Sequence, residues 1–403
     1  MINFLYLAEV PINGPQGKPI CTGGLGVSLQ NLRAATAYCH RLAWRYRRIK
    51  NRLSSKSSIL VGLRGVGKTV LLNRIWEAAK DDGYKAVLVE AHEEKQLSAL
   101  LIPPLRQILF SLDAMENVGD KAKRGFRVLS SFVKGLKLKA YEIEISVDPE
   151  LGGADRGDLE SDLGELLVAI GDAAADQGTA VAICVDELQY LDEKELSALI
   201  MAIHRINQRN LPLILVGAGL PQIVGLTGKS KSYAERLFDF PPVGQLNATD
   251  SASALQSPVR NHQVEFTESA ISEILRETQG YPYFLQQWGH EAWNIATDSP
   301  ITAENIKTAS KLAIANLDQS FFRVRFDRLT PREKEYMRAL ASLGEGNQRS
   351  GDIAAALHVK PQSIAPIRSS IIRKGMIYSP AYGDTAFTVP LFGDFLIRNM
   401  PPS

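Results

Sequence analysis

The feature that most constrains this chain is a glycine-rich segment between a predicted strand and a predicted helix. Residues Gly62-Leu63-Arg64-Gly65-Val66-Gly67-Lys68-Thr69 fit the pattern G-x-x-x-x-G-K-[ST], and Val70 completes the segment. Glycine adopts backbone dihedral angles that other residues resist, so successive N–H groups can turn inward around phosphate oxygens. The following helix directs the positive end of its dipole to the same oxygens. The segment therefore predicts a triphosphate-binding loop.

Charged and hydroxyl groups at two places complete this predicted site. Lys68 supplies a positive charge for the β- and γ-phosphates, and Thr69 offers its hydroxyl to Mg²⁺. The apolar run Val181–Val185 ends in Asp186 and Glu187, and two acids at the tip of a buried strand favour a bound cation. We predict that Asp186 holds Mg²⁺ and that Glu187 orients the attacking water. The alternative is that the two acids cap the next helix.

Short apolar runs alternate with amphipathic helices, which predicts an α/β fold with a parallel sheet flanked by helices. The intervening helices include 69–80, 97–112 and 193–207. An insertion at about 113–157 contains the basic stretch 121–139 and a predicted strand at 141–147. The predicted sheet strands are Ser58–Gly62, Ala86–Glu90, Ala180–Val185, Leu213–Val216 and, as a candidate fifth, Phe238–Val243.

Composition narrows the class of protein. The chain has 403 residues and a net charge of +2, so nothing in its overall charge attracts nucleic acid or membrane. Its cysteines, Cys21, Cys39 and Cys184, are three in number and widely spaced, which is typical of a reducing compartment. No apolar run is long enough to span a bilayer, and no signal peptide is evident. We expect a cytoplasmic protein that does not bind membranes.

Changes in residue composition and hydrophobic pattern divide the chain into four parts. Residues 1–57 form a poorly defined basic segment, in which 41–50 is either a solvated helix or arm or a nucleic-acid contact. Residues 58–246 form the predicted nucleotide-binding core. Residues 247–325 form a helical lid, with Thr267 capping one helix and Pro282 beginning the next. Residues 326–403 form the last unit.

This last unit has the pattern of a winged helix-turn-helix. Predicted helices at 330–343, 350–357 and 361–374 precede a hairpin at 378–389. If the unit binds duplex DNA, the third helix enters the major groove. It also has a second reading, in which it packs against the core or a protein partner. The candidate contacts to bases or phosphates are Gln362, Ser363 and Arg368, and those to phosphates are Arg373 and Lys374.

The phosphate loop, an extra strand before the acidic strand, and the pair Asp186-Glu187 together resemble the additional-strand ATPases. Within these, residues 58–403 are similar to the AAA+ and STAND group. The likeness extends to its initiator-like members, which are related to origin-recognition proteins, and to archaeal-type ATPases. The resemblance implies slow ATP hydrolysis with Mg²⁺ as cofactor.

Three further segments compare with this group. Leu213–Pro221 lies where the group carries a polar sensor residue, but offers only Gly217, Ala218 and Gly219. Arg236 resembles an arginine finger, acting on a neighbouring subunit of a homo-oligomer, or is an ordinary surface residue. Pro282, in a Gly-x-Pro segment, resembles a lid residue that touches the nucleotide. No arginine stands at the second sensor position there, which favours a switch over a fast motor.

Three hypotheses follow for the function. The first is a switch in which ATP controls DNA binding through 326–403. The second is a STAND-type signalling or scaffold ATPase whose winged helix contacts proteins. The third is a nucleotide-binding protein with little turnover, against which Glu187 argues.

Overall fold

The computed structural model describes residues 12–13, 19–20, 49, 55–113, 120–136, 154–231, 234–260 and 262–400. Those between 55 and 243, apart from 63–67, form one compact unit, here called the sheet unit. Those from 244 onward, with 63–67, form a second, here called the C-terminal unit. Two short strands, β1 (Ile12–Asn13) and β2 (Pro19–Ile20), pair antiparallel. Cys21, Cys39, the basic segment 41–50 apart from Ile49, and the predicted strand 141–147 lie outside the described residues.

The sheet unit is built on five parallel strands in the order β4-β5-β6-β3-β7. The phosphate-loop strand β3 and the acidic strand β5 therefore flank β6. The extra strand expected before the acidic strand is β4, which pairs parallel with β5. Because the strands are parallel, their carboxyl ends meet at one edge of the sheet. The bounds of the strands are β3 Ser57–Val61, β4 Lys85–Glu90, β5 Val181–Asp186, β6 Leu213–Gly219 and β7 Phe238–Asp239.

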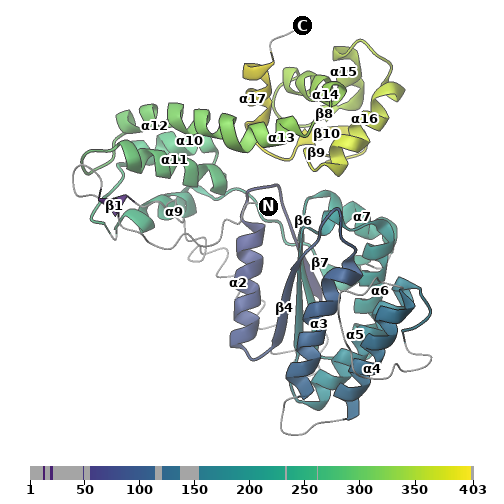
Figure 1. Cartoon of the computed structure of the whole chain (residues 1–403). Coiled ribbons are helices and arrows are strands. Elements are labelled where there is room, and N and C mark those ends of the chain that lie inside the picture. The colour runs from purple at the N-terminus through teal and green to yellow at the C-terminus, as the bar shows by residue number, and fades with distance from the viewer. Residues whose placement is uncertain are drawn as a thin grey trace. The chain divides into compact units, whose positions relative to one another are not determined.

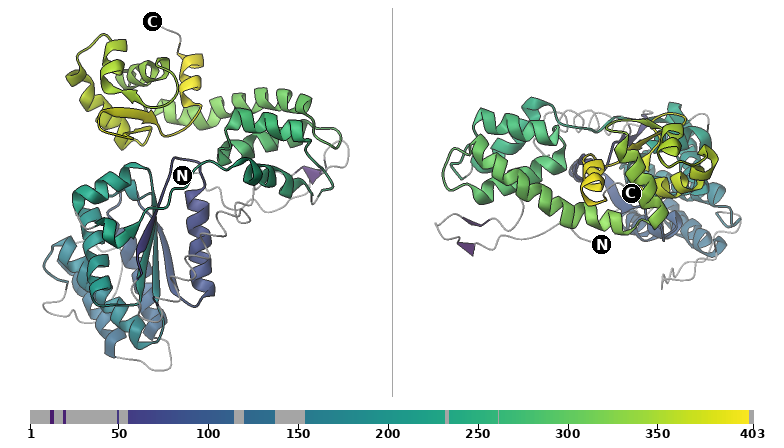
Figure 2. Two further views of the ribbon diagram at one scale, coloured as in Figure 1. Left: turned by 180° about the vertical axis from the view of Figure 1, so that it is seen from behind. Right: turned by 90° about the horizontal axis from the view of Figure 1, so that it is seen from above.

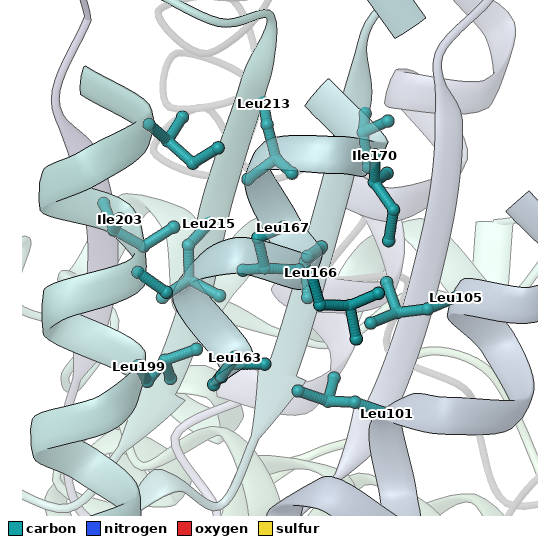
Figure 3. Packing of buried hydrophobic residues seen from close by; sticks show 14 of the residues in the cluster. Leu101, Leu105, Leu163, Leu166, Leu167, Ile170, Leu199, Ile203, Leu213 and Leu215 are labelled. Atoms are coloured by element: carbon teal, nitrogen blue, oxygen red, sulfur yellow. The ribbon is translucent and has the colours of Figure 1, made fainter. Parts of the chain in front are cut away.

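Helices cover both faces of this sheet, so its central strands are buried on both sides (Figure 1; Figure 2, left). Helix α2 (Lys68–Asp81) packs on one face through Leu72, Ile75 and Ala79. Figure 3 shows the core on the other face, where leucines and isoleucines of three helices meet those of β6. The helices on that side are α3 Leu97–Asp113, α4 Asp120–Gly135, α5 Leu159–Asp176 and α6 Glu193–Gln208.

The predicted insertion contributes a helix to the core of the sheet unit. Within the basic stretch, α4 buries Leu129 and Phe132 in the same cluster as α3 and α5. Two of its exposed basic side chains, Lys121 and Arg124, lie 3.3 and 3.9 Å from aspartate carboxylates of α5. The charges of α4 therefore form the solvated side of a packed amphipathic helix. Two shorter helices, α7 Gln222–Ser230 and α8 Ala234–Leu237, complete the unit.

The C-terminal unit begins with a group of helices. Thr267 caps the second of them, accepting a hydrogen bond from the backbone N–H of Ala270 at 3.2 Å, and Pro282 begins the third. A π-helix at Leu317–Phe322 and the short α13 (Arg323–Asp327) follow. The four main helices are α9 Ala248–Arg260, α10 Glu268–Thr278, α11 Pro282–Ile295 and α12 Ala303–Asn316.

The end of the chain combines helices with a small antiparallel sheet of order β8-β10-β9. Helix α17 was not expected from the sequence; it buries Phe392, Phe395 and Leu396 and packs on α14. The elements are α14 Pro331–Ser342, β8 Gln348–Arg349, α15 Ser350–Ala356, α16 Pro361–Arg373, β9 Ile377–Tyr378, β10 Asp384–Phe387 and α17 Phe392–Asn399.

A buried ion pair joins α14 to α16. Glu333, whose side chain is 5% exposed, accepts hydrogen bonds from Lys374 Nζ at 2.6 Å, Ser370 Oγ at 2.7 Å and the Thr330 N–H at 2.7 Å. Burial acts to raise the pKa of Glu333, but the hydrogen bonds and the Lys374 charge outweigh it and lower the pKa from 4.5 to about 2. The ionised carboxylate is therefore favoured in the folded state.

Glu333→Gln is expected to lower the free energy of unfolding by about 2–3 kcal/mol at neutral pH, because it leaves the partly buried Lys374 without its carboxylate. Because the pKa of Glu333 is lower in the folded state, its ionised carboxylate stabilises the fold at pH values above 4.5, and this stabilisation disappears as the pH falls towards 2. The destabilisation caused by Glu333→Gln should therefore become smaller over the same pH range. Urea unfolding at neutral and at acid pH measures both effects. Glu335→Gln, on the exposed side of the same helix, is the control. Equal losses from the two variants would contradict the assigned pair.

Candidate functional site

The phosphate loop connects β3 to α2. The N–H of Gly62 donates to the Gly219 carbonyl at 3.2 Å, which fixes the end of β3 against β6. Gly65 and Gly67 have φ of +81° and +91°, values at which a side chain strains the backbone. Lys68 is 6% exposed at the first position of α2, whereas Thr69 and Val70 are exposed. The loop thus has the left-handed glycines and helix N-terminus that a phosphate cradle requires.

A short hydrogen bond joins the first turn of α2 to the end of β5. Thr69 Oγ1 donates to Asp186 Oδ2 at 2.6 Å, although 117 positions separate the two residues. The N–H of Glu187 donates to the other carboxylate oxygen, Oδ1, at 2.8 Å. Asp186 itself is 5% exposed. The geometry therefore brings the hydroxyl and the buried carboxylate of the predicted metal site together.

The environment of Asp186 suits a cation. Burial, together with the smaller effect of the Glu187 charge, raises the pKa of its carboxyl to about 6, although the Thr69 hydrogen bond, the Glu187 N–H and the Lys68 charge act to lower it. Burial disfavours the charged form of this carboxyl group, so a neighbouring positive ion would stabilise it. Mg²⁺ prefers hard oxygen ligands and is bound by one or two protein groups together with substrate phosphates. Thr69 and Asp186 fit that donor set.

Glu187 has an unusual backbone and a side-chain partner. Its φ and ψ of 54° and 39° lie in the left-handed region, which non-glycine residues rarely occupy. Its carboxylate accepts a hydrogen bond from Nε2 of Gln189, in the 3-10 helix η2 (Leu188–Tyr190). Gln189 Oε1 in turn accepts the N–H of Leu220, just beyond β6, at 3.0 Å.

The glycines of β6 face this short helix. A Cβ on Gly217 would overlap Leu188, and a Cβ on Gly219 would lie 3.3 Å from Gln189 Oε1. The sequence has glycines where the resemblance led us to expect a polar residue, and the contacts with η2 give a steric reason for them. Gln189 was not among the residues expected at this site. The sequence feature that could have indicated it is a polar side chain two residues after Glu187, in a chain whose β6 ends in glycines.

The remaining candidate residues lie on other elements. Arg236 is exposed on α8 of the sheet unit. Pro282 belongs to the C-terminal unit, where it is buried at the start of α11. Cys184 is buried within β5, and burial raises the pKa of its thiol to about 12. Its thiol therefore stays protonated and packs as a core side chain.

Comparison with known proteins agrees with this geometry. Residues 40–216 match the family model described as AAA ATPase domain. The matched segment holds the phosphate loop, the acidic strand β5 and residues 213–216 of β6. Residues 319–396 match a second model, described as Domain of unknown function (DUF8462).

Three of the similar proteins come from archaea. An uncharacterised HTH-type transcriptional regulator of Methanocaldococcus jannaschii is 23% identical over 352 residues, covering 83% of this chain and 80% of the relative. The Walker-type ATPase of Pyrococcus abyssi has a TM-score of 0.50 at 16% identity, covering 84% of this chain and 90% of that one. The Aeropyrum pernix ORC1 protein, solved in complex with DNA, has a TM-score of 0.45 at 14% identity, with coverages of 94% and 97%.

These comparisons agree with the expected resemblance to AAA ATPases, and the sheet confirms the expected parallel α/β fold of the nucleotide-binding core. An AAA ATPase domain implies nucleotide binding. Within the described part of the chain, no helix combines the length and apolar character needed to cross a bilayer.

Proposed function

We propose that this protein is an ATP-hydrolysing switch that couples its nucleotide state to duplex DNA binding. The observation that carries the ATPase part is the 2.6 Å hydrogen bond between Thr69 and Asp186. It joins the phosphate loop's helix to the acidic strand, the two segments that must meet around a magnesium nucleotide.

Each residue of the site has a role in this proposal. Apart from those of Gly62 and Arg64, which donate to the carbonyls of Gly219 and Thr388, backbone N–H groups of 62–70 would surround the phosphates, and Lys68 would pair with the β- and γ-phosphates. Thr69 and Asp186 would hold Mg²⁺, which when bound neutralises charge on the phosphate oxygens. Glu187 orients the attacking water and draws its proton. Arg236, exposed on α8, would act on the ATP of a neighbouring subunit, and Pro282 would contact the nucleotide from the lid.

The DNA part of the proposal rests on residues 326–403, which we interpret as a winged helix-turn-helix. Helix α15, a turn with His358 at φ +54° and helix α16 have the order of that motif. Gln362 and Ser363 are exposed on the first turn of α16, and Tyr382, between β9 and β10, is fully exposed. The M. jannaschii relative, named as an HTH-type regulator, supports the same reading.

Two residues that the sequence offered for DNA contact have internal partners instead. Arg368 donates to Thr385 Oγ1 at 2.8 Å and to the Asp384 carbonyl at 2.7 Å, so it ties α16 to β10. Lys374 pairs with Glu333. The sequence could not anticipate this, because both partners depend on how α16 packs. The remaining basic candidate among those residues is Arg373, which is exposed.

These internal contacts favour a second candidate function. With Arg368 and Lys374 engaged internally, α16 offers fewer basic groups to DNA phosphates, and this suits a protein partner better. In that case nucleotide would control assembly, as in STAND-type scaffold ATPases. A cytoplasmic location is part of both proposals.

A non-hydrolysable ATP analogue is expected to tighten binding of duplex DNA by about 5–150-fold relative to ADP, the usual range of coupling between two sites. Fluorescence anisotropy of a labelled duplex in each nucleotide state measures it. Affinity should fall steeply as salt rises, because phosphate contacts release counterions. Equal DNA affinity in the two nucleotide states would contradict the proposed switch. A DNA affinity that does not change with salt concentration would favour the scaffold function.

A further inference from the structure

We propose that Gln189 is the positioning residue for Glu187. From η2, Gln189 makes a polar contact with the Glu187 carboxylate, which Gly217 and Gly219 of β6 have no side chain to make. The inference rests on the proposed ATP hydrolysis and concerns the orientation of the group that activates water. It is carried by an arrangement confined to the sheet unit.

The hydrogen bonds fix the orientation of the Gln189 amide. The backbone N–H of Leu220 can only donate, so the atom facing it must be the acceptor Oε1, at 3.0 Å. The amide group then turns its donor, Nε2, to the Glu187 carboxylate. A flipped amide would set a donor against a donor and Oε1 against a carboxylate oxygen. Gln189 therefore has one favourable orientation, and in it the amide holds Glu187.

Packing holds this short helix against β6. Leu188 is fully buried and occupies the space where a side chain on Gly217 would lie. The turn is closed by backbone hydrogen bonds from Tyr190 N–H to Glu187 O at 3.0 Å and from Leu191 N–H to Leu188 O at 3.2 Å. Glycine at 217 is thus the condition for η2 to approach β6, and a side chain at 219 would press on the Gln189 amide. Because the turn is anchored, the Gln189 side chain presents its amide from a fixed base.

Glu187 needs such a partner. It is only partly buried, so solvent contact alone would leave its side chain free to change rotamer. A base that activates water contributes only when it is held within hydrogen-bond reach of the reacting proton. Gln189 links this carboxylate to the end of β6, so the orientation of Glu187 depends on the position of that strand end.

Gln189→Leu is expected to lower kcat by about 10–100-fold, a part of the 10²–10⁴ that a positioned base contributes. ATP affinity should stay within about twofold, because Gln189 does not belong to the phosphate loop. Turnover and the binding of a fluorescent ATP analogue measure the two quantities. Gln208→Leu, at the exposed end of α6, is the matched control. Where the leucine variant does not fold, Gln189→Ala, which only removes atoms, replaces it.

A double-mutant cycle separates positioning from general destabilisation. In a Glu187→Gln background, Gln189→Leu should have no further effect on single-turnover hydrolysis, since there is no carboxylate left to orient. Unchanged or raised kcat in the single variant, or equal losses in both backgrounds, would overturn the inference while leaving the ATPase intact. Absence of hydrolysis in the wild-type protein would instead overturn the proposed function, and this inference with it.

Discussion

Replacing Glu187 with glutamine is expected to lower ATP turnover by about 10²–10⁴-fold while ATP remains bound, the contribution of a positioned general base. Glutamine has nearly the same shape but cannot accept the proton of the attacking water. Thr69, Asp186 and Lys68 are left unchanged, so the contacts to phosphates and Mg²⁺ persist. Steady-state phosphate release and equilibrium binding of a fluorescent ATP analogue, measured on the same preparation, test both halves of the prediction.

The control for this variant is Glu193→Gln, an identical change at the exposed start of α6. It should leave turnover within about twofold, as surface substitutions usually perturb little. If Glu187→Gln retained the wild-type rate, another group would have to activate the water, and the role assigned to the left-handed residue after β5 would be wrong.

Lys68→Ala is expected to weaken ATP binding by about 10–100-fold, which corresponds to the 1.5–3 kcal/mol of a hydrogen bond to a charged group. Lys68 is 6% exposed, so its ammonium is already largely removed from water, and little competing solvation reduces its interaction with phosphate. The fall should be larger for ATP than for adenosine, which has no phosphate to contact. Titration calorimetry with both ligands measures the difference.

Lys80→Ala is the matched control, because Lys80 lies exposed in the last turn of the same helix, over the Trp76 ring. It should leave ATP affinity unchanged. Equal ATP affinity for wild type and Lys68→Ala would argue that the loop at 62–69 does not cradle a triphosphate.

Local sequence was enough to place the strands and the phosphate loop. A continuous run of apolar residues such as 181–185 is removed from water only in a strand whose sheet is covered on both faces. Strand β5 is buried along its whole length. The spacing of glycines, lysine and threonine in 62–69 reflects the dihedral angles and charges of one short segment. These properties are encoded within a few neighbouring residues, so they can be read without the fold.

Only the tertiary structure decided which polar side chains are free and which are occupied. Arg368 and Lys374 are basic residues of the kind that contact DNA. In the structure they instead bind Asp384 and Glu333, which belong to elements that pack on α16. In the sequence, Gln189 looks like an ordinary polar residue. Its role becomes visible only in the structure, where the order of the strands places Leu220 beside it. Periodicity in a sequence records burial, but hydrogen-bond partners across elements depend on the order and register in which those elements pack.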